Sequence, residues 1–221
     1  MPEAIVCIFA KPPVPGSAKQ SLIPELGPER AAELAEAFLE DTVAMVRTVP
    51  WAECIIAATK IFARSYFKPE EVWLQSEGDL GERLEKVLRL ALKRKPIVLA
   101  IGADSPGLPA AYLQAARDAL NNADAVLGPT ADGGFYLIGL KDCPVGVLEG
   151  IQWSHSTTLA ATTHKLEQFG MRPCSSIPGL TFIAMKILNA FAACWPTILP
   201  PRPAPPNCSA NRHRSEAFVS K

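Results

Sequence analysis

The sequence predicts an α/β domain built on a mixed, mostly parallel β-sheet with helices on both faces. Short apolar runs alternate along the chain with segments whose apolar residues recur at helical spacing, which is typical of a sheet covered by helices. Two of the apolar runs, residues 125–128 and 135–140, lie too close together for a helical crossover. At least one pair of strands is therefore expected to be antiparallel.

Seven segments are expected to form the strands, because each is a short apolar run of the kind that a sheet buries. The run at residues 97–101 is the most informative, since it is followed closely by a carboxylate, Asp104. The seven segments are Ala4 to Ala10, Cys54 to Thr59, Val72 to Gln75, Ile97 to Ile101, Ala125 to Gly128, Phe135 to Leu140 and Met171 to Ser175.

Four helices are expected between these strands. The first begins near Pro28, a residue that favours the first helical position, and continues with apolar residues at helical spacing. The second follows Asp79, and Glu82 three positions later completes the pattern of a capping box. The third runs from Pro109 to about Leu120, and the fourth runs from about Ser156 to about Phe169.

Residues 1–195 are interpreted as a single domain, because a chain of 221 residues suffices for one α/β domain and nothing divides it earlier. The chain changes character at Pro196, after which prolines interrupt any regular pattern. Residues 196–221 are therefore expected to be an extended or disordered tail without chemistry. The basic residues of this segment leave open the alternative of a docking tail.

The charge balance and the cysteines limit the class of partner. With 22 basic and 22 acidic residues, no overall field attracts nucleic acid or an anionic membrane. The six cysteines are scattered and form no Cys-x-x-Cys pair, so reduced core thiols are expected. The amino terminus has neither a basic lead nor an apolar run long enough for a signal peptide or a membrane span. A cytoplasmic protein is therefore expected.

The loop after the first predicted strand carries two lysines, Lys11 and Lys19, and one glycine, Gly16, among several prolines. Backbone amides and ammonium groups in such a loop can bind phosphate oxygens. The glycine spacing matches neither a Walker loop nor the dinucleotide Gly-x-Gly-x-x-Gly pattern. A phosphate-binding loop and an ordinary surface loop with solvated lysines both stay open.

Asp104 should lie at the carboxyl edge of the sheet, where ligands of open α/β sheets bind. Its carboxylate could hold Mg²⁺ or Mn²⁺, because hard cations prefer carboxylate oxygens and often share them with substrate phosphates. No histidine or cysteine cluster in the sequence indicates zinc. The alternative is that Asp104 caps the turn before the next helix by accepting backbone N–H groups.

A second acid, Asp132, stands beside Gly133 and Gly134 between two predicted strands. The glycines either form a hairpin turn, which needs positive φ angles, or allow the close approach of a bulky ligand. Trp153 is either a residue at the edge of the core or a stacking surface. His155 has no evident partner in the sequence and is interpreted as a surface residue.

Five motifs occur in order along the chain: FAKPPVPG at residues 9–16 with Lys19 and Leu22, GDLGER at 78–83, GADSPGLP at 102–109, DGGFYLIG at 132–139 and GIQWS at 150–154. Together they resemble the glycosyltransferase A-fold superfamily of nucleotide-diphospho-sugar transferases, in particular its radical-SAM/selenodomain-associated transferase branch. Each motif alone is a weak signal, whereas the ordered set is specific and extends over about residues 4 to 175.

The resemblance implies a Rossmann-like sheet of the glycosyltransferase A type, a nucleotide or nucleotide-sugar donor, and Mg²⁺ or Mn²⁺ bridging the diphosphate. Asp104 is then the metal ligand and Lys19 a phosphate contact, and both are catalytic candidates because cations offset phosphate charge in the transition state. More distantly, the chain is similar to guanylyltransferases that act on phospholactate-type acceptors. The residues implied in donor or acceptor binding are Lys11, Gly16, Asp79, Arg83, Ser105, Asp132, Gly133, Gly134 and Trp153.

Two departures from the family pattern bear on activity. The first loop has Ser21 where relatives usually have the arginine of Lys-Thr-Arg-Leu, so one guanidinium is missing near the phosphates. The segment comparable to the Asp-x-Asp-Thr-Pro sequence of relatives is TFIAMK at residues 181–186, which has no carboxylate. Weaker metal binding and weaker catalysis are therefore expected if relatives use those groups.

The leading hypothesis is a metal-dependent transferase with a nucleotide or nucleotide-diphospho-sugar donor and a small-molecule acceptor. Glycosyl transfer is favoured slightly over nucleotidyl transfer of the guanylyltransferase type. The alternative from another class is a degenerate nucleotide-binding protein without turnover, which the two departures favour. The base, the sugar, the acceptor and the oligomeric state all stay open at this point.

Overall fold

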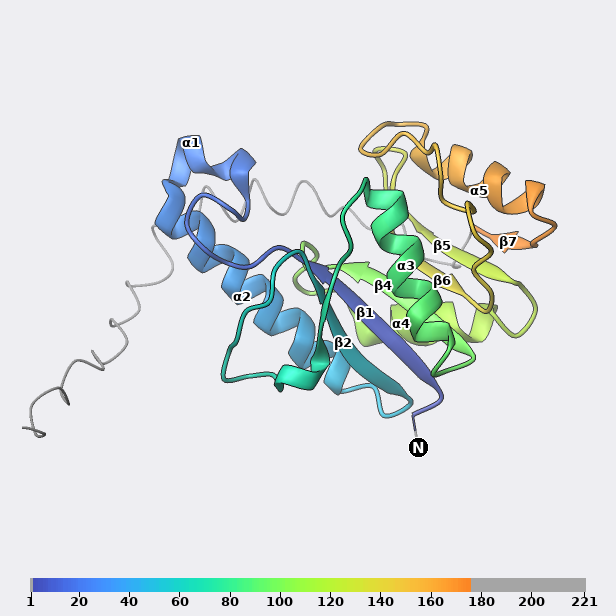
Figure 1. The fold of residues 1–221 in the computed structure, drawn as a ribbon, viewed down its shortest axis with the longest axis horizontal. Coiled ribbons are helices and arrows are strands. Elements are labelled where there is room, and N and C mark those ends of the chain that lie inside the picture. The colour runs from blue at the N-terminus through green and yellow to red at the C-terminus, as the bar shows by residue number, and fades with distance from the viewer. Residues whose placement is uncertain (1, 176–221) are drawn as a thin grey trace, which may run out of the picture.

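Residues 2–175 are described by a computed structural model, in which seven strands form one mixed sheet (Figure 1). The order across the sheet is β3-β2-β1-β4-β6-β5-β7, and β6 is antiparallel to both of its neighbours while all other neighbouring pairs are parallel. The predicted fold class and the predicted antiparallel pair are thereby confirmed. The strands are β1 (Ala4–Ala10), β2 (Ala52–Ala58), β3 (Val72–Leu74), β4 (Ile97–Gly102), β5 (Ala125–Pro129), β6 (Phe135–Leu140) and β7 (Pro173–Cys174).

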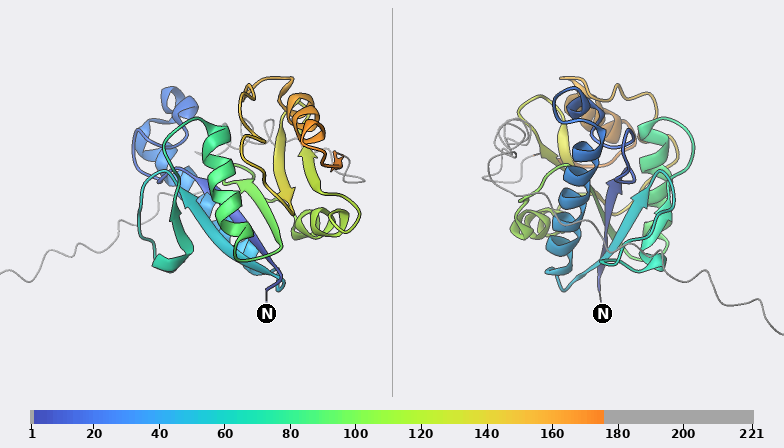
Figure 2. Two further views of the ribbon diagram at one scale, coloured as in Figure 1. Left: turned by 45° about the vertical axis from the view of Figure 1, so that its right-hand side comes forward. Right: turned by 90° about the vertical axis from the view of Figure 1, so that its left-hand side faces the viewer.

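Helices cover both faces of the sheet (Figure 2). Because successive strand residues point to opposite faces, Val6 and Ile8 of β1 pack in the layer of α2 and α4, whereas Ile5 and Cys7 pack in the layer of α3 and α5. The helices are α1 (Ile23–Leu26), α2 (Pro28–Arg47), α3 (Leu80–Leu92), α4 (Ala110–Ala119) and α5 (Thr158–Gln168), with the short 3₁₀ turns η1 (Gln20–Leu22) and η2 (Pro69–Glu71).

The predicted elements agree with the structure except at some of their ends. The predicted strand at residues 171–175 is shorter, since β7 has only two residues, and α5 begins at Thr158 rather than near Ser156. Pro109 is the residue before α4 rather than its first residue. The turns η1 and η2 and the short helix α1 were not predicted. The predicted domain end at residue 195, the tail 196–221 and the segment 181–186 lie outside the described residues.

Helix α3 begins as its sequence predicts. Asp79 Oδ1 accepts the backbone N–H of Glu82 at 2.9 Å, and Glu82 Oε2 accepts the backbone N–H of Asp79 at 3.0 Å. These reciprocal bonds satisfy two backbone donors that the first turn of a helix leaves without partners. The capping box therefore fixes where α3 starts, which is a short segment after the edge strand β3.

A buried glutamate of α3 holds the segment that follows β6 and runs back toward the end of the sheet where β6 begins. Glu85 accepts hydrogen bonds from the backbone N–H of Gly146 at 2.9 Å and of Leu148 at 3.4 Å. Gly81 lies so close to this segment that a Cβ there would stand 2.3 Å from the carbonyl oxygen of Leu148. A buried carboxylate needs such donors, and only glycine fits at position 81.

None of the helices in the described part of the chain is both long and apolar enough to cross a membrane. Cys7, Cys54 and Cys143 are free and buried, as expected of core thiols, while Cys174 is free and half-buried. Burial raises the pKa of Cys54 and of Cys143 to about 12, so both thiols stay protonated near neutral pH. Cys194 and Cys208 lie outside the described residues.

Asp124, the residue before β5, connects β7 to the sheet through Arg172. Its carboxylate accepts the backbone N–H of Arg172 at 3.0 Å and the side-chain Nε–H of the same residue at 2.9 Å. The side-chain bonds from Arg172, followed by the backbone bond, lower the pKa of Asp124 to about 2. The carboxylate is therefore ionised in the folded protein over most of the acid range.

Replacing Asp124 with asparagine is expected to lower the melting temperature at pH 7, because the ionised carboxylate pairs with Arg172 only in the folded state. A depressed pKa contributes stability above the unfolded value, about 3.9, and this contribution is lost as the pH falls toward about 2. Melting curves of the wild type and Asp124→Asn should therefore begin to converge below about pH 4 and coincide only near pH 2. Glu33→Gln, at an exposed position of α2, is the control; an equal pH-dependent difference there would contradict the assignment.

Candidate functional site

The carboxyl edge of the sheet gathers the predicted site residues. Strands β1 to β5 all end at this edge because they are mutually parallel, and the antiparallel β6 begins there. The chain continues from β1 to β2 on one side and from β4 to β5 on the other, and ligands of open α/β sheets bind where the strand order reverses in this way. The crevice between the ends of β1 and β4 is therefore the candidate site.

Lys19 and Asp104 meet at this crevice. Lys19, which follows the loop after β1 with a left-handed backbone, donates through Nζ to Asp104 Oδ1, and its Nζ lies 4.7 Å from the centroid of the Phe38 ring on α2. The Lys19 side chain is only 9% exposed, whereas that of Asp104 is 76% exposed. A lysine held by an aromatic ring thus reaches an open carboxylate, and two residues predicted to act together lie in contact.

The turn-capping alternative for Asp104 does not match its contacts. Within the described residues, the carboxylate bonds to Lys19 and accepts no backbone N–H. Asp79 and Asp132, by contrast, both accept backbone N–H groups, as capping residues do. Of the three acids of the predicted site, Asp104 is therefore the one that does not act as a cap, and its contacts are compatible with a ligand-binding role.

The loop that carries Lys11 and Gly16 is held at its base by residues that were not predicted from the sequence. Arg64, in the segment after β2, donates to both carboxylate oxygens of Glu36 on α2 at 2.6 and 2.7 Å and to the carbonyl of Pro13 at 3.3 Å. Lys11 is exposed, and Gly16 has a φ of +79° with open space where a Cβ would stand. The loop is thus fixed at its base, while its tip is accessible to a ligand.

Arg83 lies at the start of α3, at the same edge of the sheet. Its Nε donates to the carbonyl oxygen of Asp79 at 3.1 Å, and its Nη1 donates to Gln75 Oε1 at 3.1 Å. The guanidinium is half-buried and held by two groups of the protein. Gln75 was predicted only as the end of a strand, because a polar residue at that position carries no signal of its contact with Arg83.

The Asp132-Gly133-Gly134 segment forms the turn between β5 and β6. Asp132 Oδ1 accepts the hydroxyl of Thr130 at 2.5 Å and the backbone N–H of Gly134 at 3.2 Å, and these bonds lower the pKa of Asp132. Gly133 has a φ of +84°, and a Cβ there would stand 1.9 Å from the carbonyl oxygen of Ser156. Local structure therefore accounts for Gly133, while the ionised Asp132 remains exposed at the edge.

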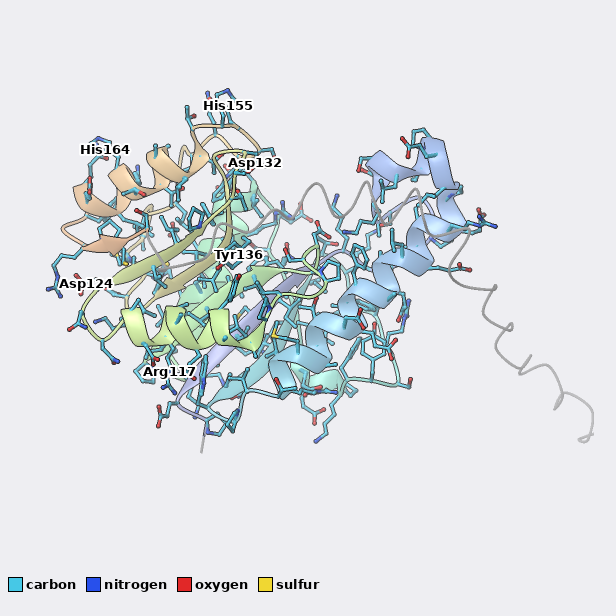
Figure 3. The ribbon with its side chains drawn as sticks, turned by 180° about the vertical axis from the view of Figure 1, so that it is seen from behind. Arg117, Asp124, Asp132, Tyr136, His155 and His164 are labelled. Carbon is cyan, nitrogen blue, oxygen red and sulfur yellow. The ribbon has the colours of Figure 1, made fainter. Side chains whose placement is uncertain are left out.

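The first turn of α5 and the loop before it lie against this turn. The backbone N–H of Leu159 donates to the carbonyl of Gly133 at 2.9 Å, and Figure 3 shows Asp132 and His155 near one another at this edge. Trp153 packs edge-to-face on Phe135, with ring centroids 6.0 Å apart, and its Nε1 is buried without a hydrogen-bond partner among the described residues. Trp153 thus belongs to the core edge. His155 is exposed, and its Nδ1 lies 2.8 Å from Thr157 Oγ1.

The donor set at the crevice fits a metal ion that is shared with a substrate. Among residues 2–175, no group of three or more histidine, cysteine, aspartate or glutamate side chains could hold a metal by itself. Mg²⁺, however, is usually bound by one or two carboxylates together with substrate phosphates rather than by a cage of protein ligands. An exposed Asp104 satisfies that requirement only when a phosphate ligand is also present.

A hollow lies beside Ser105, the residue that follows Asp104. It has a volume of about 340 Å³ and lies between α2 and the loop after β4, where it is lined by Asp41, Thr42, Ala44, Met45, Ser105, Gly107 and Leu108. Ser105 is the predicted site residue in this lining. A larger hollow of about 420 Å³ lies among Arg47, Glu53, Cys54 and Glu71 at the amino end of β2. Ligands of such sheets bind at the carboxyl edge, and of the two hollows only the smaller is lined by residues of a loop at that edge.

This architecture, with a single antiparallel strand in the sheet, is the fold of nucleotide-diphospho-sugar transferases and nucleotidyltransferases. A putative nucleotide-diphospho-sugar transferase from Desulfovibrio desulfuricans G20 is 28% identical with a TM-score of 0.69, over 80% of each chain. A 4-diphosphocytidyl-2C-methyl-D-erythritol synthase from Anaerococcus prevotii DSM 20548 has a TM-score of 0.51 at 12% identity, over 88% of this chain and 96% of that one. A cytidylyltransferase from Leptospira borgpetersenii has a TM-score of 0.50 at 11% identity, over 90% of this chain and 89% of that one.

The chain belongs to the DUF2064 family, which is described as an uncharacterized protein conserved in bacteria and which matches residues 42–155. No curated protein matches the chain. At their low identities, the A. prevotii and L. borgpetersenii enzymes show the fold alone. Together with the similarity to the D. desulfuricans protein, the family match confirms the resemblance to nucleotide-diphospho-sugar transferases that the sequence motifs indicate.

Proposed function

We propose that this protein is a metal-dependent transferase that binds a nucleotide or nucleotide-diphospho-sugar donor in the crevice between β1 and β4. The observation that carries the proposal is the contact between Lys19 and Asp104. It joins a cation and an anion from two loops at the carboxyl ends of adjacent central strands. In a sheet of this order, that is where the phosphates of a nucleotide bind.

Each charged residue of the crevice has a role in this proposal. Lys19 and Lys11 bind phosphate oxygens as point charges, and Arg83 binds an oxygen through its remaining N–H groups. Asp104 holds Mg²⁺ or Mn²⁺, and the ion supplies charge neutralisation at the diphosphate. Asp132 orients a hydroxyl of the donor or the acceptor by accepting a hydrogen bond. The small volume beside Ser105 suits a small-molecule acceptor.

Glycosyl transfer is the reaction that we favour, because the D. desulfuricans protein, at 28% identity, is described as a putative nucleotide-diphospho-sugar transferase. Nucleotidyl transfer is the second candidate, supported by the L. borgpetersenii cytidylyltransferase, which shares the fold. A nucleotide-binding protein without turnover is the third, supported by Ser21 in place of the arginine usual in relatives and by the single exposed carboxylate in contact with Lys19.

Thermal denaturation with a panel of ligands tests the proposal. ATP, CTP, GTP, UTP, UDP-glucose and GDP-mannose are each added with Mg²⁺ and with EDTA. A ligand at about 100 times its dissociation constant adds about 2.7 kcal/mol of stability, which corresponds to a rise of about 5 to 10 °C for a domain of this size. We expect at least one member of the panel to give such a rise in Mg²⁺ and a smaller one in EDTA.

The outcomes of this experiment separate the candidates. No Mg²⁺-dependent rise with any nucleotide contradicts the proposed function. A rise with a nucleotide sugar favours glycosyl transfer, and a rise with a nucleoside triphosphate alone favours nucleotidyl transfer. Consumption of the nucleotide is then measured by chromatography in the presence of a panel of sugar, alcohol and phospho-acid acceptors. A rise in melting temperature without consumption of the nucleotide favours the protein without turnover.

A further inference from the structure

Gln75, directly after β3, is a buried polar residue that is not among the groups proposed to bind the donor, the acceptor or the metal. The residue is 7% exposed. Its backbone N–H donates to the carbonyl of Ala58 at 2.7 Å and so extends the pairing of β3 with β2, while its side-chain Nε2 donates to the carbonyl of Ala57 at 2.6 Å. Both bonds anchor Gln75 on the strand next to it.

The bond to Ala57 determines which way the amide of Gln75 faces. A carbonyl can only accept a hydrogen bond, so the side-chain nitrogen of Gln75 must point to Ala57 and the side-chain oxygen must point away from it. That oxygen accepts Nη1–H of Arg83 at 3.1 Å. Glutamine is the side chain whose single amide satisfies both partners here, since a carboxylate would repel the carbonyl of Ala57.

The second anchor of Arg83 comes from its own helix. Nε donates to the carbonyl of Asp79, the residue that caps α3. With Nε and one proton of Nη1 engaged, the two protons on Nη2 have no partner among the described residues. Nε–H and Nη1–H lie on different edges of the planar guanidinium, so the two anchors together fix its plane. The Nη2 protons are left as donors of fixed direction, which can bind the oxygens of a phosphate.

We propose that Gln75 is a positioning residue that orients Arg83 to bind a phosphate group of the nucleotide donor. This inference rests on the proposed function and adds to it a residue that does not itself touch the donor. Gln75 transmits the geometry of the β2–β3 pair to the guanidinium. The alternative is that Gln75 only satisfies backbone groups at the end of the sheet, in which case its effect on binding is independent of Arg83.

A double-mutant cycle distinguishes these roles. Gln75→Met, Arg83→Met and the double variant are prepared, with Gln168→Met on α5 as the control. The dissociation constant is measured by calorimetry in Mg²⁺ for the member of the panel ATP, CTP, GTP, UTP, UDP-glucose and GDP-mannose that stabilises the wild type most. We expect Gln75→Met to weaken binding about 5- to 20-fold when Arg83 is present and less than about 2-fold when Arg83 is replaced. Gln168→Met should leave it unchanged.

The other outcomes overturn the inference in distinguishable ways. If the wild type binds no member of the panel, the proposed function fails and the role of Gln75 fails with it. If the wild type binds but Gln75→Met has no effect, or has the same effect in both Arg83 backgrounds, only the positioning role fails. Gln75→Leu is the second variant. If neither variant shows a cooperative unfolding transition, Gln75 is required for the fold and the positioning role is rejected.

Discussion

Replacing Asp104 with alanine is expected to remove the Mg²⁺ dependence of nucleotide binding while leaving the fold intact. The carboxylate is 76% exposed and accepts no backbone N–H among the described residues, so its removal should change stability by less than about 1 kcal/mol. Loss of a charged ligand contact should raise the dissociation constant in Mg²⁺ about 10- to 100-fold, toward the value measured in EDTA. Calorimetric titrations of both proteins under both conditions measure this.

A matched variant of Lys19 separates the metal ligand from the phosphate contact. Lys19→Met keeps an aliphatic stem over the Phe38 ring but loses the ammonium group. We expect it to weaken binding about 10-fold or more both in Mg²⁺ and in EDTA, because the lysine acts on phosphate directly. Lys93→Met, at the exposed end of α3, should bind as the wild type does. Unchanged Mg²⁺ dependence in Asp104→Ala would exclude Asp104 as the metal ligand.

Gly133→Ala is expected to give the largest loss of stability of any single methyl group added to the turn between β5 and β6. The backbone there has a φ of +84°, and the new Cβ would stand 1.9 Å from the carbonyl oxygen of Ser156. Both the strained conformation and the forced separation of the two loops destabilise, by about 3 kcal/mol or more together. The melting temperature should fall by about 6 to 12 °C.

Gly150→Ala is the matched control for this prediction. Gly150 also has a positive φ, +73°, but nothing lies within 4 Å of a Cβ placed there. It should therefore show only the conformational cost of about 1 to 2 kcal/mol. Comparing the thermal unfolding of the two variants separates the cost of a Cβ at positive φ, which both share, from the cost of the close contact, which only Gly133→Ala has. Equal melting temperatures would contradict the contact between Gly133 and Ser156.

Much of the sheet follows from local sequence patterns. The run Ala4 to Ala10 is apolar at every position because β1 is central and covered on both faces, and the predicted bounds are those of the strand. The spacing of Asp79 and Glu82 gave the start of α3, since a capping box is formed by residues three apart. The short separation of residues 125–128 from 135–140 required an antiparallel pair, which β5 and β6 form.

The contacts of the site could not be read from local patterns. Lys19 and Asp104 are 85 positions apart, and their contact depends on the adjacency of β1 and β4, which no short motif encodes. The same holds for Arg64 and Pro13, which meet only because β2 lies beside β1. Gln75 was recognised as the end of a strand, but the direction of its amide depends on the carbonyl of the neighbouring strand. Such residues are defined by tertiary packing.

The buried Glu85 has a mechanical consequence for the two sides of the crevice. By holding the N–H groups of Gly146 and Leu148, it joins α3, which carries Arg83, to the segment that leads to Trp153 and the loop lying on Gly133. Helix α3 and this segment, which come from distant parts of the chain, are thereby held in a fixed relative position. A ligand that contacts Arg83 and Asp132 together meets donors and acceptors whose separation is set before it arrives, which lowers the entropy cost of binding.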